Sequence, residues 1–415
     1  MKNSKGLSNM THNNKFYSQY SESLKRKKII DINSMLCILY FFQFGLLLPL
    51  SKFVGLQSII LIFTVLIIIV LVKNNWGEKI NLSMFFLIII PILIIGIKYF
   101  LYPNNNENAI QILMYFVTIG ISGIVIGSYP ISLEKFLDFG YKIGVLNFFL
   151  LFLDPFFGFY EINYMRFGYA LLPSVLFIFV KVYKNKRMRG KILPLIFFLI
   201  SLFEIFLFGA RGCFIATMFF VAIYLMIVDK KHYLLKGLLI SLGFVMWIYL
   251  YQVLIFIANL ISSLGFSSYS ISKYIRAFEE GIAGTSSGRA ELYALAIENI
   301  KESPLIGNQF TSSNSESSFE YYHNIFLQIG SEFGVVVLAF FAVFILFSLI
   351  KSLLFSNLNK KIVYMIMFSV VFGRLMFSSD YWQRPEFWLF MGIYFRGTLA
   401  SRVDVRNNKN EINVM

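Results

Sequence analysis

Residues 192–228 read ILPLIFFLISLFEIFLFGARGCFIATMFFVAIYLMIV, an apolar stretch interrupted at Gly209-Ala210-Arg211-Gly212. Each arm has close to the ~20 residues that a helix needs to cross ~30 Å of hydrocarbon. A helix satisfies its backbone groups internally, and no alternation with period two suggests a barrel strand here. The stretch therefore predicts two membrane-spanning helices joined by a tight turn.

The same pattern recurs along the whole chain. Of its 415 residues, 58% are hydrophobic and only 14% are charged, which leaves more apolar surface than a soluble core can hide. We therefore predict an all-α, polytopic membrane protein with about 12 transmembrane helices. The expected spans lie near residues 31–50, 53–72, 81–101, 109–127, 133–153, 167–182, 192–209, 212–228, 237–258, 324–350, 362–378 and 386–400.

Basic residues predict the orientation of these spans. With the N-terminus inside, 26 of the 37 Lys and Arg residues fall in cytoplasmic segments, and both termini are cytoplasmic. The net charge of +15 is thus mainly a topology signal, with anionic lipid as a secondary partner and no indication of nucleic acid. The apolar run after residue 28 is of full length and lacks a cleavage site, so residues 1–28 are expected to stay as a tail.

One long polar segment divides the chain. The expected organisation is a cytoplasmic tail (1–28), helices 1–9 (29–258), an external loop (259–322), helices 10–12 (323–400) and a second cytoplasmic tail (401–415). The external loop is too long for a simple connection, so we expect it to act as a catalytic loop or lid. Cys37 and Cys213 lie in separate apolar runs and indicate neither a disulfide nor a thiolate metal site.

Some basic residues are not explained by topology because they fall on or near the predicted outer face. Snorkelling from a helix end is the simpler interpretation for Lys52, Lys98 and Lys142. Arg211 has no acidic neighbour in its turn and indicates function, unless it pairs with Glu204 two turns earlier. The full set is Lys52, Lys98, Lys142, Arg166, Arg211, Lys273, Arg276, Arg289, Lys301, Arg374 and Arg384.

The external loop contains an amphipathic helix. Residues 289–301 have helical periodicity, with Ser287 as a candidate N-cap and Pro304 and Gly307 as stop signals. The apolar face carries Leu292, Tyr293, Ala296 and Ile300, and the polar face carries Glu291, Glu298, Lys301 and Glu302.

Arg289 falls in the middle of that apolar face and is expected to point at the membrane body. A cation in the first turn opposes the helix dipole, whereas the free N–H groups there suit a phosphate or pyrophosphate. Arg289 is therefore a candidate pyrophosphate ligand. Stacking on Tyr293, or pairing with a carboxylate such as Glu280, is the structural alternative.

His323 is the only histidine on the predicted outer side. Asn324, Gln328 and Glu332 follow at intervals of four, as a polar stripe that enters the next span and must face protein or a wet cavity. A neutral histidine can take a proton from a hydroxyl at pH 7, which makes His323 the candidate base. An interfacial histidine bonded to a backbone carbonyl is the structural alternative, and Asp154 or Glu161 are alternative bases.

Five short motifs stand beside this loop, and in their order they resemble the O-antigen ligase and polymerase (Wzy-type) family of integral membrane glycosyltransferases. The resemblance covers roughly residues 209–334. The motifs are GARG (209–212), SGR (287–289), SPLIG (303–307), YHN (322–324) and QIGSEFG (328–334).

The resemblance implies a glycosyltransferase that acts on undecaprenyl-pyrophosphate-linked glycans. The sequence has no Asp-x-Asp motif, and one outer histidine cannot build a site of clustered metal ligands, so we expect catalysis without a metal. The resemblance also implies that Arg211 and Arg289 bind the pyrophosphate and that His323 is essential. In a departure from the family pattern, Tyr321-Tyr322 stands where ligases often carry a second histidine. The expected site comprises catalytic His323, Arg289 and Arg211, converging on one outer-facing cavity, and substrate-binding Arg276, Asn324, Gln328, Glu332, Asp380 and Arg384.

The predicted function is polymerisation of lipid-linked repeat units into O-antigen or capsular polysaccharide at the outer face of the bacterial cytoplasmic membrane. No metal and no cofactor are expected. A chain-length regulator and a flippase are possible partners. One alternative is an O-antigen ligase that transfers polymer to lipid A-core. Another is a polysaccharide flippase or transporter, although the chain lacks the internal repeat typical of transporters.

Overall fold

The computed structural model describes residues 4–52, 55–76, 82–157, 163–185, 187–228, 237, 248–265, 268–281, 289–308, 310, 321–355 and 357–396. These residues contain helices and no strand, which confirms the predicted all-α class. The main helices are α1 (Ser4–Leu47), α2 (Leu56–Asn74), α3 (Leu82–Leu101), α4 (Asn106–Tyr115), α5 (Ile121–Ser128), α6 (Leu133–Leu151), α7 (Asp154–Phe157), α8 (Tyr164–Lys184), α9 (Met188–Phe208), α10 (Arg211–Ile227), α12 (Leu250–Ser263), α13 (Tyr269–Glu279), α15 (Arg289–Glu302), α16 (Ile325–Leu354), α17 (Leu358–Leu375) and the helical residues 385–396.

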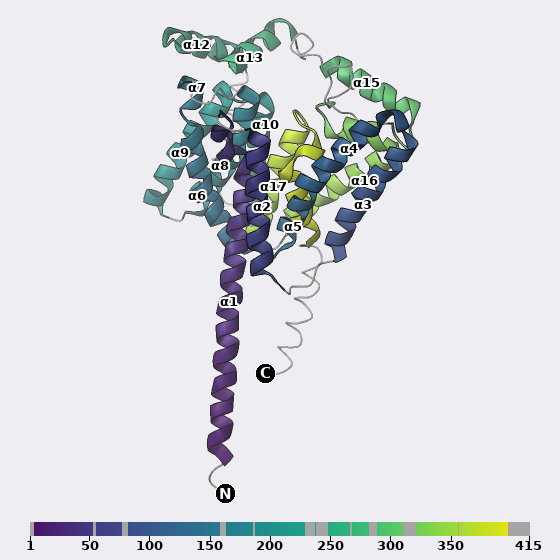
Figure 1. Ribbon diagram of the computed structural model, residues 1–415. Helices are drawn as coiled ribbons and strands as arrows, with labels where there is room; N and C mark the ends of the chain where they lie inside the picture. The colour runs from purple at the N-terminus through teal and green to yellow at the C-terminus, as the bar shows by residue number, and fades with distance from the viewer. Residues whose placement is uncertain are drawn as a thin grey trace.

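Seven of the described helical segments are long and apolar enough to cross a membrane, so the protein is a multi-pass membrane protein. α10 and α12 are apolar but shorter. The expected count of about 12 spans is not confirmed. Residues 238–247 of the expected span at 237–258 lie outside the described residues, and its last part belongs to α12, which lies across the end of the bundle together with α13 (Figure 1).

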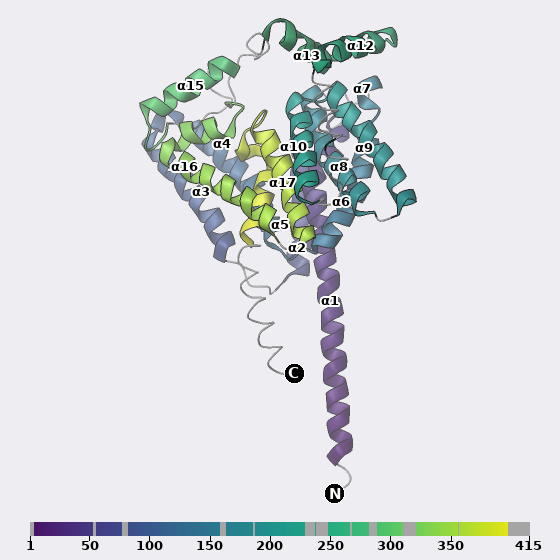
Figure 2. The same cartoon turned by 180° about the vertical axis from the view of Figure 1, so that it is seen from behind.

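α8 and α17 form the centre of the bundle. Every residue from Phe167 to Val180 in α8 and from Ile362 to Phe372 in α17 is buried, as expected for helices that are apolar on all sides. α6, α9 and α10 lie on one side of this centre, and α3, α4, α15 and α16 lie on the other (Figures 1 and 2). The site residues therefore come from two groups of helices that α17 separates.

The two ends of the bundle differ. α1 projects from one end, whereas α12, α13 and α15 cover the opposite end, here called the loop end (Figures 1 and 2). The polar N-terminal segment and the long polar loop thus lie on opposite sides, as the charge distribution predicts. Which side faces the cytoplasm stays a prediction.

α15 confirms the predicted amphipathic helix. It starts at Arg289 and ends at Glu302, just before Pro304. Leu292 and Ala296 are buried in a small cluster with Tyr322, and all four residues of the predicted polar face are exposed. The proposed N-cap, Ser287, lies outside the described residues. The packing of α15 on the start of α16 brings two candidate site residues together.

Candidate active site

His323 occupies an unusual backbone position directly before α16. Its φ of 54° lies in the left-handed region, which a non-glycine residue adopts rarely and at some cost. The imidazole packs against Tyr321, with ring centroids 4.3 Å apart, and Nδ1 is buried without a partner in the described part of the chain. Burial, and then the charge of Arg289, lower the pKa of His323 to about 4. The ring is therefore neutral at pH 7.

Arg289 is the first residue of α15 and is half-buried. Its charge reaches His323 because Leu292, one turn later, packs with Tyr322. Arg289 makes no ion pair with a carboxylate of the described residues. Glu280, the predicted structural partner, lies 4.0 Å from Arg276 instead.

Arg211 opens α10 at the turn between α9 and α10, and this turn contacts α13. The hydroxyl of Ser270 in α13 donates to the Gly209 carbonyl at 2.7 Å. Burial raises the pKa of Tyr274, also in α13, to about 12, and the charge of Arg211 partly offsets that rise. The alternative pairing with Glu204 is not formed, because both carboxyl oxygens of Glu204 are buried without a hydrogen-bond partner among the described residues.

Tyr169 of α8 packs against the start of α10, the helix that Arg211 opens. Its hydroxyl is 2.7 Å from the position that a Cβ on Gly212 would take. The charge of Arg289 also acts on the phenol, and the guanidinium of Arg374 lies 5.2 Å from the ring. Tyr169 is only 4% exposed, yet its hydroxyl completes no hydrogen bond of good geometry with a described residue, although the Ser378 hydroxyl and the Cys213 thiol are close enough to influence it.

Sequence reasoning missed Tyr169. A tyrosine in an apolar helix with no nearby motif is indistinguishable from a core residue until the helices are packed. The only sequence signal is its neighbour Gly168, whose added Cβ would lie 2.7 Å from the Ala210 amide nitrogen. A glycine there lets α8 approach the turn that carries Arg211.

The polar stripe after His323 is half-buried at Asn324 and fully buried at Gln328 and Glu332. The side-chain oxygen of Asn324 caps α16 by accepting from the amides of Phe326 and Leu327 at 2.9 and 3.3 Å. The amide of Gln328 then donates to both Glu332 and Asp380, at 3.0 and 2.8 Å. The structure thus brings together the stripe and the last loop.

Glu332 is fully enclosed by donors from that loop. Its second carboxyl oxygen accepts from the Tyr381 hydroxyl at 2.6 Å and from the Trp382 indole at 3.2 Å. Asp380 is 3% exposed and caps the short helix η4 (Tyr381–Gln383) by accepting from the Trp382 amide. Because burial is the largest influence, the pKa of Asp380 is raised to about 6.

Two further arginines lie beside this network. Arg374 forms a buried ion pair with Glu386 at 2.8 Å and donates to Ser379 at 3.1 Å. Burial, and then the charge of Arg374, lower the pKa of Arg384 to about 10. Arg384 Nε has no partner among the described residues.

The remaining predicted residues lie apart from His323. Arg276 is exposed on α13 and is in contact with Glu280. Asp154 is buried at the start of α7, and Glu161 lies outside the described residues. Lys142 is exposed and pairs with Asp138 at 2.8 Å, and its snorkelling stays a prediction, whereas the side chain of Lys52 is not described.

The snorkelling interpretation of Lys98 is wrong. Its side chain is 4% exposed, and its ammonium group donates to two backbone carbonyls within the protein. A buried ammonium is stable only if polar groups replace its water shell, and the carbonyls of residues 306 and 308 do so here.

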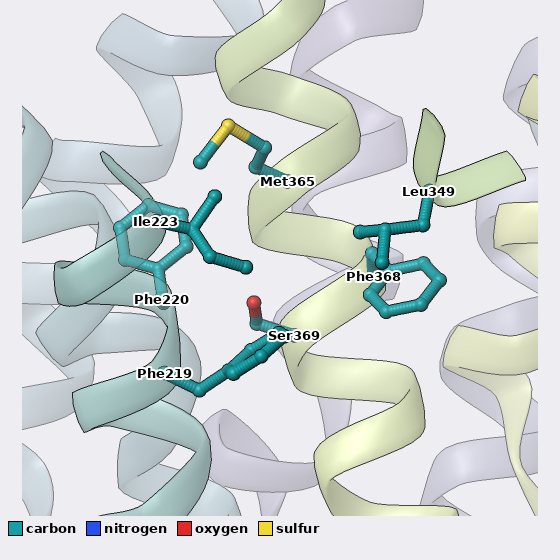
Figure 3. A pocket seen from close by; sticks show the side chains of 7 residues that line it. All are labelled: Phe219, Phe220, Ile223, Leu349, Met365, Phe368 and Ser369. Atoms are coloured by element: carbon teal, nitrogen blue, oxygen red, sulfur yellow. The ribbon is translucent and has the colours of Figure 1, made fainter. Parts of the chain in front are cut away.

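Two small pockets of the described structure are not lined by Arg211, Arg289 or His323. The first lies between α10, α16 and α17, with the Ser369 hydroxyl among six apolar side chains (Figure 3). The second is lined by Phe41, Tyr169, Arg374 and Glu386, among others. Convergence of Arg211, Arg289 and His323 on one cavity therefore stays a prediction. No three His, Cys, Asp or Glu side chains of the described residues are grouped so that they could hold a metal ion.

In a comparison with known proteins, one family model covers the three catalytic candidates. Residues 195–342 match the family model described as O-antigen ligase. The matched region includes Arg211, Arg289 and His323, and it ends before Asp380 and Arg384. No curated protein and no solved structure matches the chain.

Proposed function

We propose that this chain, which belongs through residues 195–342 to the O-antigen ligase family, polymerises undecaprenyl-pyrophosphate-linked repeat units. The family is one of glycosyltransferase-like membrane enzymes. The observation that carries the proposal is the contact between α15 and α16, which brings the charge of Arg289 near enough to lower the pKa of His323 inside the matched domain. A cation near a neutral proton acceptor suits a reaction in which an anion leaves as a hydroxyl attacks.

In the proposed reaction, a hydroxyl of the lipid-linked acceptor unit attacks the anomeric carbon of the donor glycan. The bond from that carbon to the pyrophosphate oxygen breaks, and undecaprenyl pyrophosphate leaves with the electron pair. The hydroxyl proton passes to a ring nitrogen of His323. Arg211 and Arg289 stabilise the charge that builds on the pyrophosphate, as preorganised cations do in a site of low dielectric.

Substrate binding tunes the base in this scheme. The pKa of His323 is lowered to about 4 partly by the charge of Arg289, so the free enzyme holds a weak base. A pyrophosphate bound to Arg289 would neutralise that charge and raise the pKa of His323. A base works best when its pKa approaches the working pH, so the donor would activate its own catalyst.

The hydroxyl of Tyr169 would donate to the pyrophosphate. It lies beside Gly212, it senses the charge of Arg289, and no described residue accepts from it in good geometry. A buried donor without a well-placed partner is costly, and a charged ligand oxygen would satisfy it.

We assign positioning roles to the buried polar residues. Gln328 donates to both Glu332 and Asp380, and this network would fix the last loop, and hence Arg384, against α16. The cap formed by Asn324 would hold the backbone of His323. Arg276, exposed on α13, would contact substrate only as the donor approaches.

The loop end would face the outside of the bacterial cytoplasmic membrane, with both termini inside, because the basic residues favour that orientation. Donor and acceptor are both lipid-linked, so each would reach the loop end from the bilayer. A flippase would supply the units and a chain-length regulator would limit their number. Catalysis would need no metal, because arginines neutralise the leaving group.

A ligase that transfers finished polymer to lipid A-core is the second candidate, favoured by the description of the matching family model. Tyr321 and Tyr322 favour the polymerase, since they stand where ligases often carry a second histidine. Here Tyr321 donates to the Ser378 carbonyl at 2.9 Å, and Tyr322 accepts from Asn299 at 2.6 Å. Both tyrosine hydroxyls are thus hydrogen-bonded within the protein, and these bonds hold the segment that leads into His323.

The test uses purified protein in lipid nanodiscs with undecaprenyl-pyrophosphate-linked repeat units, in the presence of EDTA. We expect a ladder of longer lipid-linked glycans and release of undecaprenyl pyrophosphate. Transfer to lipid A-core without chain extension would establish the ligase instead. Movement of the lipid-linked unit across the membrane without any glycosyl transfer would support a transporter and refute both.

A further inference from the structure

The turn that follows α15 fits into a break in α16. At Gly334 the helix leaves its regular path, with φ 82° and ψ 176°. The Val335 amide therefore donates to the Pro304 carbonyl at 2.7 Å, and the Asn308 amide donates to the Ser331 carbonyl at 2.6 Å. The turn thereby satisfies helix groups that the break leaves without partners.

Two glycines permit this fit. Gly307 has a φ of 74°, and a Cβ added to it would lie 2.4 Å from the backbone of Glu332. A Cβ on Gly334 would lie 2.6 Å from the Pro304 and Leu305 carbonyl oxygens. The SPLIG motif is therefore a backbone connector between α15 and α16, and side chains at its last position are excluded.

Lys98 holds this connector from the opposite side. Its ammonium donates to the Ile306 carbonyl at 3.1 Å and to the Asn308 carbonyl at 2.6 Å. The Tyr102 hydroxyl donates to the Gly307 carbonyl at 2.7 Å, and the Asn108 amide donates to the Phe310 carbonyl at 3.3 Å. Side chains of α3 and α4, with Tyr102 between them, thus hold four carbonyls of residues 306–310.

Lys98 makes no ion pair with a carboxylate of the described residues. Its ammonium lies 5.0 Å from the Tyr102 ring and 5.8 Å from the Phe333 ring, and Glu332 interacts with it only at longer range. The charged ammonium group of Lys98 therefore binds the backbone carbonyls of Ile306 and Asn308. A charged donor binds carbonyls more strongly than a neutral one, which suits a residue that must hold a backbone in place.

We propose that Lys98 is a positioning residue for the transfer reaction, acting through residues 306–308 to set Arg289 and His323 at their working separation. The inference rests on the proposed function. α15 carries Arg289 at its start and enters the connector at its end, while His323 precedes the half of α16 that the connector braces. A shift of the connector would therefore change the distance between the two groups, and a displacement of ~1 Å can cost ~10²-fold in rate.

The experiment compares Lys98→Met with Lys98→Arg and with Lys142→Met, which removes an exposed lysine of the same predicted face. For Lys98→Met we expect a kcat about 10- to 100-fold lower per folded molecule, with KM little changed. We also expect the acid limb of kcat/KM to move to higher pH, because Arg289 no longer lowers the His323 pKa fully. Lys98→Arg should recover part of the rate, and Lys142→Met should match the wild type.

A purely structural role would lower the amount of folded protein but leave kcat per folded molecule and the pH profile unchanged, and that result would overturn the proposal. If Lys98→Met does not fold, Tyr102→Phe takes its place, because it removes only the bond to the Gly307 carbonyl. It should shift both readouts in the same direction by less, and no shift in either would also overturn the proposal.

A second measurement distinguishes failure of the proposed function from failure of the positioning role of Lys98. If the wild type transfers no glycan, the histidine titration of His323 by NMR still reports the geometry. An altered His323 pKa in Lys98→Met would then support the positioning role in whatever reaction the site performs. An identical titration curve in the two proteins would refute it.

Discussion

The charge of Arg289, at the first position of α15, reaches the imidazole of His323 just before α16 and lowers its pKa. The two residues belong to helices joined by a connector, and their proximity depends on the packing of Leu292 with Tyr322. This pair and its surroundings lead to four expected outcomes, each with its own measurement.

Replacing Arg289 by Gln should raise the pKa of His323 from about 4 toward, but not to, its ordinary value, because burial is the larger cause of the shift. NMR titration can measure this, since the chain has only three histidines and His323 is identified by its loss in His323→Asn. An unchanged pKa in Arg289→Gln would show that the two groups are farther apart than described. Lys301→Gln, at the exposed end of α15, is the matched control and should leave the pKa in place.

Replacing His323 by Asn should abolish most transfer while keeping the fold. Asn tolerates the left-handed conformation that His323 adopts at φ 54°, better than Ala does, and it cannot accept a proton. General-base catalysis is worth about 10²- to 10⁴-fold, so the rate of chain extension should fall by that factor. Wild-type turnover by well-folded His323→Asn protein would exclude His323 as the base.

Replacing Tyr169 by Phe should lower kcat without lowering stability. The lost hydroxyl leaves no well-placed protein partner unsatisfied, whereas its bond to a charged substrate oxygen would be worth about 1.5–3 kcal/mol, or roughly 10- to 100-fold in rate. Tyr40→Phe is the matched control. The Tyr40 hydroxyl bonds to Ser122 at 3.0 Å inside the bundle, so its loss should lower the melting temperature and leave kcat unchanged.

When melting temperature and kcat are measured on the same preparations, Tyr169→Phe should lower only kcat and Tyr40→Phe should lower only the melting temperature. If Tyr169→Phe melted earlier and turned over at the wild-type rate, the phenol would be a structural group, bonded to a neighbour such as Ser378.

Replacing Asp380 by Asn should reduce the pH dependence of stability. The folded-state pKa of Asp380 is raised to about 6 from an ordinary 3.8, so the folded protein holds the proton that the unfolded chain releases. Stability should thus decline as pH rises from about 4 to about 6. The Asn oxygen can still accept from Gln328 and Trp382, so the variant should show a shallower decline than the wild type.

Melting temperatures between about pH 4 and pH 8 measure this effect on either side of the Asp380 pKa. Asp138→Asn removes a half-exposed carboxylate instead and should keep the wild-type slope. Equal slopes in wild type and Asp380→Asn would mean that Asp380 ionises without cost in its buried position.

The elements that depend on local sequence are those that could be predicted. Membrane helices follow from runs of apolar residues, α15 from its periodicity, and the end of α15 from Pro304, because each reflects interactions within a few turns. The order of the motifs likewise indicated the domain that residues 195–342 match. Arg289 and His323 could both be identified as candidates from the sequence, because each is a polar, ionisable residue in a mostly apolar chain.

Only the tertiary structure decided which distant segments of the chain contact one another. Lys98 resembles any lysine at a helix end, yet packing carries it to carbonyls 208 and 210 positions away, at Ile306 and Asn308. Tyr169 resembles a core tyrosine until α10 lies against it. The bond from Gln328 to Asp380 links α16 to a loop beyond α17. Such contacts form because whole helices bury their faces together, a choice made by the sum of many apolar contacts and not by the residues that meet as a result.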